Sequence, residues 1–168
     1  MFFIRSASPA DLAKVSALLG RSSHSAYGEL YGSPKVDELN ARWHSVAHLT
    51  ALLARPDSEF VVADDGQRIG GMAFAAMAKN EADVVYLHKL YVEPELFGQG
   101  IGRDLFAEVE TCFPAAKRMR LEVEPKNERA VRFYAGLGFH EVGWAANSGP
   151  DRSGIPAMIM EKELSFPS

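Results

Sequence analysis

The sequence predicts an α+β fold in which a mainly antiparallel central sheet is flanked by helices. Short apolar runs typical of strands alternate with segments of helical spacing, and an Asp65-Gly66 pair, typical of a hairpin turn, separates two of the runs. The predicted order is β-α-α-β-β-β-α-β-α-β-β. Because the chain has 168 residues and no internal repeat, we expect residues 1–168 to form a single domain.

The first half of the chain supplies a strand, two helices and a hairpin. Ser8 and Pro9 mark a helix start, and the helix carries an apolar stripe of Leu12, Val15, Leu18 and Leu19. Residues 20–34 break this pattern with Ser, Gly and Tyr, so we expect a loop there. Helical spacing returns over residues 35–53, and two strands over 59–65 and 66–78 form the hairpin.

The second half continues the alternation. A strand over residues 82–92 is apolar enough to lie centrally in a sheet, and a helix follows with Ile101, Leu105, Val109 and Cys112 on one side. A strand over 118–125, a helix over 127–139 and two strands over 139–146 and 156–164 complete the chain, the last two joined by a loop over 147–154.

Composition limits the function classes. The net charge of −4 argues against nonspecific nucleic-acid binding, and a single cysteine excludes an internal disulfide or a multi-cysteine metal site. The first residues contain too short an apolar run for a signal peptide, and no segment is long enough to span a bilayer. We therefore expect a cytoplasmic protein without membrane partners; a homodimer is compatible with the sequence.

Three glycines, Gly98, Gly100 and Gly102, stand where strand gives way to helix. A Walker loop is excluded because Arg103 follows the last glycine where lysine is required, and a dinucleotide fingerprint is excluded because the glycine spacing does not fit. Glycines before a helix still allow backbone N–H groups to face a phosphate at a helix N-terminus. A tight turn without a ligand is the alternative.

Two stretches, "LYVEPELFGQGIGRDLF" and "LEVEPKNERAVRFYAGLGF", together resemble the GNAT superfamily of acetyl-CoA-dependent N-acetyltransferases. The first matches the family's pyrophosphate-binding motif over residues 97–102, with Phe97 in place of the usual Arg or Gln. The second matches the family pattern at Asn127, Phe133, Tyr134, Gly138 and Phe139. The resemblance implies a GNAT-like fold and acetyl transfer from acetyl-CoA to a primary amine of a small molecule, by direct attack in a ternary complex. Acetylation of a protein or peptide amine, or a noncatalytic acyl-CoA-binding or sensing domain, is the alternative.

The resemblance also implies a cofactor site. The backbone of Leu90 and Val92 would pair with the pantetheine arm like an added strand. The pyrophosphate would lie on the motif Phe97, Gly98, Gln99, Gly100, Gly102 and Arg103, with the amides of the last four residues donating to it. Asn127 matches a residue that often contacts the pantetheine arm, and it is equally a good N-cap for the helix that follows.

Two catalytic groups are expected. Tyr134 falls on the family's usual general acid, which protonates the leaving thiolate; the alternative is a core tyrosine on the apolar face of its helix. His88 resembles a position where some members carry a histidine that acts as base, directly or through water, and an unperturbed histidine titrates near 6.5. Strand alternation puts Tyr86, His88 and Leu90 on one side of their strand. A hydrogen-bonded core histidine is the alternative.

The acceptor amine is not specified by the sequence. In this family the segment between the first two helices and the last hairpin usually shape its site, so Tyr27, Glu29 and Tyr31, together with Asp37 and Glu38, are candidates to bind a cationic amine. An ordinary solvated loop is the alternative. His44 and His48 have the spacing of two zinc ligands on a helix, but the glutamate and a third ligand are missing, so no metal is expected.

Overall fold

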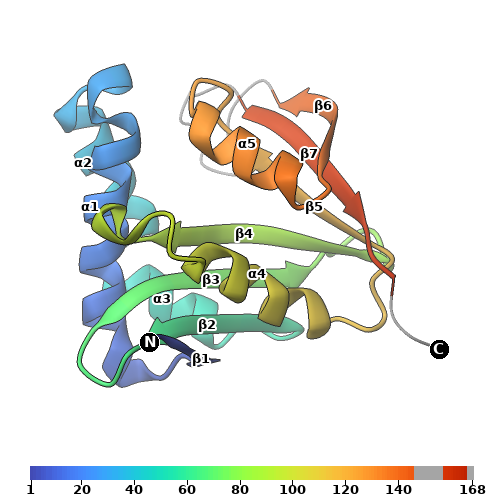
Figure 1. Ribbon diagram of the computed structural model, residues 1–168, viewed down its shortest axis with the longest axis horizontal. Helices are drawn as coiled ribbons and strands as arrows, with labels where there is room; N and C mark the ends of the chain where they lie inside the picture. Colours follow the sequence, from blue (N-terminus) through green and yellow to red (C-terminus); the bar gives the residue numbers. More distant parts are fainter. Residues whose placement is uncertain (146–156, 166–168) are drawn as a thin grey trace. The chain divides into compact units, whose positions relative to one another are not determined.

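The computed structural model describes residues 1–145 and 157–165 (Figure 1). The predicted fold class is confirmed, since within these residues seven strands lie in one mostly antiparallel sheet with the order β1-β2-β3-β4-β5-β7-β6. The chain forms two compact units: Met1–Ala76 with Lys89–Cys112, and Met77–His88 with Phe113–Ser168. The predicted 147–154 loop lies outside the described residues.

The elements of the first unit follow the predicted order with one helix added. They are β1 (Phe3–Ser6), the 3₁₀ turn η1 (Pro9–Asp11), α1 (Leu12–Tyr31), α2 (Ser33–Trp43), α3 (Val46–Leu53), β2 (Ser58–Asp64), β3 (Ile69–Met77), the 3₁₀ turn η2 (Pro94–Leu96) and α4 (Ile101–Thr111). Strand β4 (Val84–Val92) begins in the second unit and ends in the first.

The core of the first unit uses both faces of its strands. Leu18 and Leu49, from α1 and α3, are fully buried against the β2–β3 face that carries Val62 and Phe74. Helix α4 covers the opposite face, drawn in front of β2 and β3 in Figure 1: a Cβ at Gly71 would come within 3.0 Å of the Leu105 side chain. Strand alternation thus separates two apolar faces, each covered by helices.

The predicted loop over residues 20–34 is wrong. Helix α1 continues to Tyr31 and ends at Gly32, whose φ of 82° is left-handed, and α2 starts one residue later. Local composition did not predict this part of the helix, because tertiary contacts stabilise its additional turns. The hydroxyl of Ser22 donates to the Val92 carbonyl at 3.2 Å, and Arg21 pairs with Glu93. Such contacts override weak helix propensity.

The helix predicted over residues 35–53 is divided in two. Helix α2 ends at Trp43, and Ser45 caps α3 by accepting a hydrogen bond from the His48 N–H at 3.2 Å. The capping geometry requires an extended Ser45, which interrupts the helix without disturbing the apolar spacing. Three helices therefore stand where two were predicted.

The remaining elements form the second unit: β5 (Arg118–Val123), α5 (Glu128–Gly136), β6 (His140–Ala145) and β7 (Ala157–Glu163). Strand β4 pairs with β5 in parallel over three residue pairs, Val84–Tyr86 with Arg118–Arg120, and β7 lies antiparallel between β5 and β6. Buried Leu121 and Met160 share one face of β5 and β7, and Tyr134 and Phe139 are buried in the same unit.

Candidate active site

An exposed turn rich in glycine links β4 to α4. Phe97, Gly98, Gln99 and Gly100 are all exposed, and Gly98 and Gly100 have φ angles of 83° and 85°. A Cβ at either glycine would meet no atom within 4 Å. The glycines are therefore required by the left-handed backbone, which L side chains rarely adopt, and not by crowding within the protein.

The turn delivers the N-terminus of α4 to solvent. Gly100 is the N-cap, no side chain caps the helix, and the first backbone bond of the helix runs from the Asp104 N–H to the Gly100 carbonyl at 3.0 Å. The preceding amides, from Ile101 to Arg103, belong to the first turn, where no carbonyl four residues earlier can accept them. Together with the helix dipole, this arrangement suits an anion such as a phosphate.

The other predicted cofactor residues of the first unit flank this turn. Leu90 and Val92 are half-buried in β4, and the Val92 carbonyl already accepts a hydrogen bond from Ser22. Gly102 and Arg103 lie in the first turn of α4, and the Phe97 side chain is 41% exposed. The phenyl group that replaces the usual Arg or Gln is thus not part of the core.

An ion pair between buried Glu93 and exposed Arg21 lies at the start of the turn and was missed by sequence reasoning. Glu93 is only 3% exposed and accepts a hydrogen bond from Arg21 Nε at 2.9 Å. The carboxylate raises the pKa of Arg21 through this bond. The Glu93 N–H donates to the Gly70 carbonyl at 2.9 Å. The sequence shows an acidic residue between a strand and a proline, but it does not identify the partner of this residue, which lies 72 positions away.

Tyr134 and Asn127 both lie on or beside α5 in the second unit. Tyr134 is 9% exposed, and its ring makes edge contacts with Phe133 and Phe139 at centroid distances of 5.3 and 5.7 Å. Asn127 caps α5 by accepting the Ala130 N–H at 3.3 Å, which confirms its predicted capping role. The apolar contacts of Tyr134 suit the core interpretation and are equally compatible with a buried general acid.

His88 is exposed on β4, so the core-histidine interpretation is wrong. Its ring stacks on Tyr86 with a centroid distance of 5.3 Å and an interplanar angle of 24°, which agrees with the prediction that both lie on one side of the strand. Burial, and next the negative charge of Glu122, raise the pKa of Tyr86. His88 is therefore accessible to solvent and held in orientation by an aromatic neighbour.

Comparison with known proteins decides the family. The family model described as an acetyltransferase (GNAT) domain matches residues 30–164. The chain belongs to the GNAT acetyltransferase family. Members of this family are acetyl-transfer enzymes, and the predicted resemblance is confirmed.

Individual GNAT proteins give a closer view. The chain is 27% identical to the uncharacterized N-acetyltransferase YjgM of Escherichia coli over 134 residues, 79% of this chain and 74% of that protein. It is 35% identical to the peptidyl-lysine N-acetyltransferase YiaC of Escherichia coli, but over only 45% of this chain and 47% of that protein. The crystal structure of the PaiA N-acetyltransferase from Thermoplasma acidophilum in complex with coenzyme A has the same fold, with a TM-score of 0.83, 22% identity and coverage of 97% of this chain and 99% of that one.

The residues predicted to bind the acceptor lie on helices of this GNAT fold, not in a loop. Tyr27 and Tyr31 share one side of α1, with ring centroids 6.3 Å apart, and Glu29 is exposed on the same helix. Asp37 and Glu38 are exposed on α2, and Asp37 pairs with His24 Nε2 at 2.8 Å. These residues are held by regular backbone, so their positions are better defined than those of a solvated loop.

His44 and His48 do not share a helix. His44 ends α2 and is buried, with Nδ1 2.6 Å from the Asn40 side-chain oxygen, whereas His48 lies in α3. Burial, followed by the charges of Lys89 and His48, lowers the pKa of His44 to about 3, so its ring stays neutral. In the part of the chain that the structure describes, no three His, Cys, Asp or Glu side chains are grouped to hold a metal ion.

Cys112 is half-buried and its thiol lies 3.2 Å from the Glu108 carbonyl. Burial, and next the negative charges of Glu59 and Glu108, raise its pKa, which disfavours the reactive thiolate.

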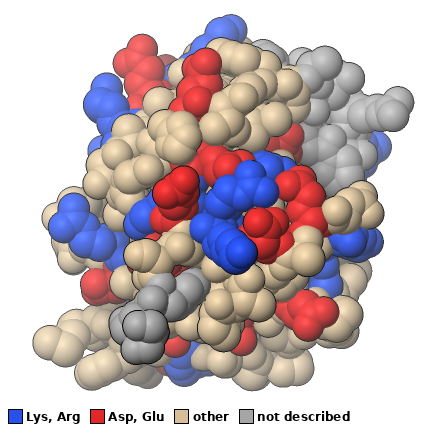
Figure 2. All heavy atoms as spheres, turned by 90° about the vertical axis from the view of Figure 1, so that its right-hand side faces the viewer, with Lys and Arg blue, Asp and Glu red and all other residues tan. Residues whose placement is uncertain are grey.

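No helix among residues 1–145 and 157–165 is both long and apolar enough to cross a membrane. Figure 2 shows basic side chains interspersed with acidic ones, so that face has no extended basic patch for nucleic acid.

Proposed function

We propose that this GNAT enzyme transfers the acetyl group of acetyl-CoA to a primary amine of a small molecule, by direct attack in a ternary complex, and that residues 1–168 act as a single acetyltransferase domain. The observation that carries the proposal is the exposed left-handed turn at Gly98 and Gly100, which presents the uncapped N-terminus of α4. The coenzyme A bound to the PaiA relative supports the same ligand here.

The residues present fit such a ligand. The amides of Gln99, Gly100, Gly102 and Arg103 would donate to the pyrophosphate, and the absence of side chains at Gly98 and Gly100 would let it approach the backbone. Backbone amides supply this grip, so Phe97 would reduce binding only modestly. Leu90 and Val92 would pair with the pantetheine arm, Val92 through its N–H because its carbonyl is engaged by Ser22.

The proposed chemistry needs two proton transfers. An alkylammonium with a pKa near 10.4 is only about one part in 10³–10⁴ neutral at pH 7, so a base must remove a proton before nitrogen can attack. His88 takes that proton, directly or through water, and its exposure on β4 suits the task. Tyr134 gives its phenolic proton to the departing sulfur, which carries the electron pair of the broken C–S bond. Asn127 would contact the pantetheine arm with the part of its amide that does not cap α5.

Tyr27, Glu29 and Tyr31 would receive the acceptor, because aromatic faces and a carboxylate attract a cationic amine. The similarity to YiaC, named a peptidyl-lysine N-acetyltransferase, supports a second candidate in which the acceptor is a lysine of a protein or peptide. Thiol release from acetyl-CoA, measured with a panel of small amines and a panel of lysine peptides, distinguishes the two kinds of acceptor. A noncatalytic acyl-CoA-binding domain would release no thiol with either panel.

Calorimetry on a matched pair of glycine variants tests the cofactor site. Gly100→Glu places a bulky anion against the proposed diphosphate and should lower acetyl-CoA affinity by at least about 100-fold. Gly66 is the control because its φ is also positive, 95° against 85°, and its Cβ would also meet no atom within 4 Å. Gly66→Glu therefore introduces the same backbone strain of about 1 kcal/mol and the same charge. Equal affinities in the two variants would contradict the proposal.

A further inference from the structure

A buried carboxylate lies just beyond the end of β5. Glu124 is 5% exposed, its Oε1 accepts the Lys126 N–H at 3.1 Å, and its backbone carbonyl accepts the Asn127 N–H at 3.0 Å. Its Oε2 is also buried, and among the described residues it has no hydrogen-bond partner. Buried polar atoms are nearly always bonded, so this oxygen is expected to meet a donor that the described residues do not supply.

Two other acids of this unit differ. Glu81 accepts hydrogen bonds from Arg120 at 2.7 and 3.3 Å, and Glu161 accepts from Arg118 and Arg120 at 3.2 and 2.9 Å. Their charges are paired and partly exposed. Glu124 instead precedes α5, whose N-terminal dipole favours a negative charge without occupying Oε2. Glu124 therefore differs from these two acids in having an oxygen without a partner among the described residues.

The position of Glu124 is also informative. The parallel ladder between β4 and β5 ends at the pair Tyr86 and Arg120, although β5 continues to Val123. Parallel strands present their carboxyl ends at the same edge of a sheet. Glu124 therefore follows β5 at the edge toward which β4 carries His88, the proposed base.

We infer that Glu124 Oε2 accepts a hydrogen bond from the nitrogen of the acceptor amine as it enters as an ammonium ion; the inference rests on the proposed function. The amine is the cationic reactant, and a buried carboxylate bonds a cation more strongly than a neutral donor. The acyl donor offers only neutral hydrogen-bond donors, namely its amides, hydroxyls and adenine amino group, besides its anionic phosphates, which the carboxylate repels. Glu124 thus selects amines that arrive protonated and holds the nitrogen while His88 removes the proton.

Glu124→Gln tests this assignment. Glutamine keeps an oxygen for the Lys126 N–H and places an NH₂ donor where Oε2 accepted. For the fastest substrate among ethylamine, putrescine and lysine ethyl ester, KM should rise about 10–100-fold, the usual effect of losing a charged hydrogen bond. The Kd for acetyl-CoA, measured by calorimetry, should stay within about twofold of wild type. Glu128→Gln is the matched control, because it removes one charge from the first turn of the same helix at an exposed position.

Each result has a defined meaning. An unchanged amine KM in Glu124→Gln overturns the inference, and so does a weakened acetyl-CoA Kd with an unchanged amine KM. Glu124→Met provides a second variant of similar size if Glu124→Gln does not fold. If wild type acetylates none of the amines, the proposed function fails, and the thermal midpoint measured with 20 mM amine tests the inference separately. A midpoint that the amine raises in wild type and Glu128→Gln, but not in Glu124→Gln, supports amine binding at Glu124. A midpoint that the amine still raises in Glu124→Gln overturns the inference.

Discussion

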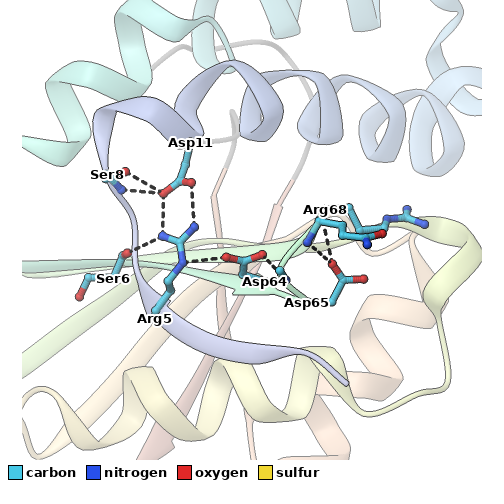
Figure 3. Close-up of polar contacts among 9 residues, drawn as sticks. Arg5, Ser6, Ser8, Asp11, Asp64, Asp65 and Arg68 are labelled. Atoms are coloured by element: carbon cyan, nitrogen blue, oxygen red, sulfur yellow. Dashed lines mark hydrogen bonds and ion pairs between the residues drawn. The ribbon is translucent and has the colours of Figure 1, made fainter.

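Replacing Asp11 by Asn should destabilise the first unit in a pH-dependent way. The Arg5 guanidinium donates two hydrogen bonds to Asp11, at 2.8 and 2.9 Å, and a third to Asp64 at 3.0 Å (Figure 3). The Ser8 N–H donates to the Asp11 carboxylate at 2.8 Å, so Ser8 caps the 3₁₀ turn η1 at the predicted helix start, and α1 itself begins at Leu12. Chiefly through the Arg5 hydrogen bond, the pKa of Asp11 falls from 3.8 to about 2.

The expected magnitude follows from this pKa. An Asp that titrates near 2 when folded and near 3.9 when unfolded contributes at most about 2.6 kcal/mol at pH 7. Because the Arg5 side chain is 41% exposed, solvent screening reduces our expectation to about 1–2 kcal/mol. The pKa is depressed by folding, so this stabilisation is complete above about pH 5 and is lost as pH falls from about 4 through 2.

Urea unfolding at pH 7, 5, 4, 3 and 2 measures both effects. Asp11→Asn should lose about 1–2 kcal/mol at pH 7, and its free energy of unfolding should vary less than that of wild type between pH 4 and 2. Glu95→Gln, which breaks a more exposed pair with Arg68, should change stability by less than about 0.5 kcal/mol. Equal stability of Asp11→Asn and wild type at pH 7, or parallel pH curves, would refute the reasoning.

Two further predictions concern catalysis. Tyr134→Phe should lower kcat about 10²–10⁴-fold with little change in the KM for acetyl-CoA, because the ring keeps its contacts while the acid is lost. Steady-state kinetics measures both constants, and an unchanged kcat would mean that Tyr134 has only a packing role in the core. His88→Ala and His88→Gln should each lower kcat/KM about 10²–10⁴-fold and remove the acidic limb of the pH–rate profile. Their thermal midpoints should equal that of wild type, because His88 is exposed. His140→Gln, a control at another exposed histidine, should keep the wild-type pH–rate profile.

Local signals made much of the fold predictable. Pro9 after Ser8, the Asp65-Gly66 pair and Asn127 before α5 each act through contacts within three residues, and all three occur as predicted. Asp65 accepts the N–H groups of Gln67 and Arg68 at 2.8 Å, which closes the hairpin. Such features depend on sequence neighbours alone, so a sequence specifies them.

Long-range contacts explain what was not predictable. Residues 20–31 are rich in Ser, Gly, His and Tyr, and they are helical because Ser22 and Arg21 bond to residues 70 and 72 positions away. For the site, the motif located the Gly98–Gly100 turn, but strand alternation gave only the side on which His88 lies and not whether anything covers it. The Glu124 oxygen that lacks a partner among the described residues was beyond sequence reasoning, because its partners depend on the folded positions of residues distant in the chain.

The choice of base also follows from pairing. Glu81 is another candidate base, but Arg120 holds its carboxylate by two hydrogen bonds and lowers its pKa, with Arg118 3.5 Å away. A carboxylate stabilised in this way is a weak base, because protonation would weaken both hydrogen bonds to the guanidinium. Glu29, a further candidate base, is exposed on α1. If His88 variants retain full activity, Glu29 is therefore the next candidate base to test, ahead of Glu81, whose carboxylate is held by Arg120.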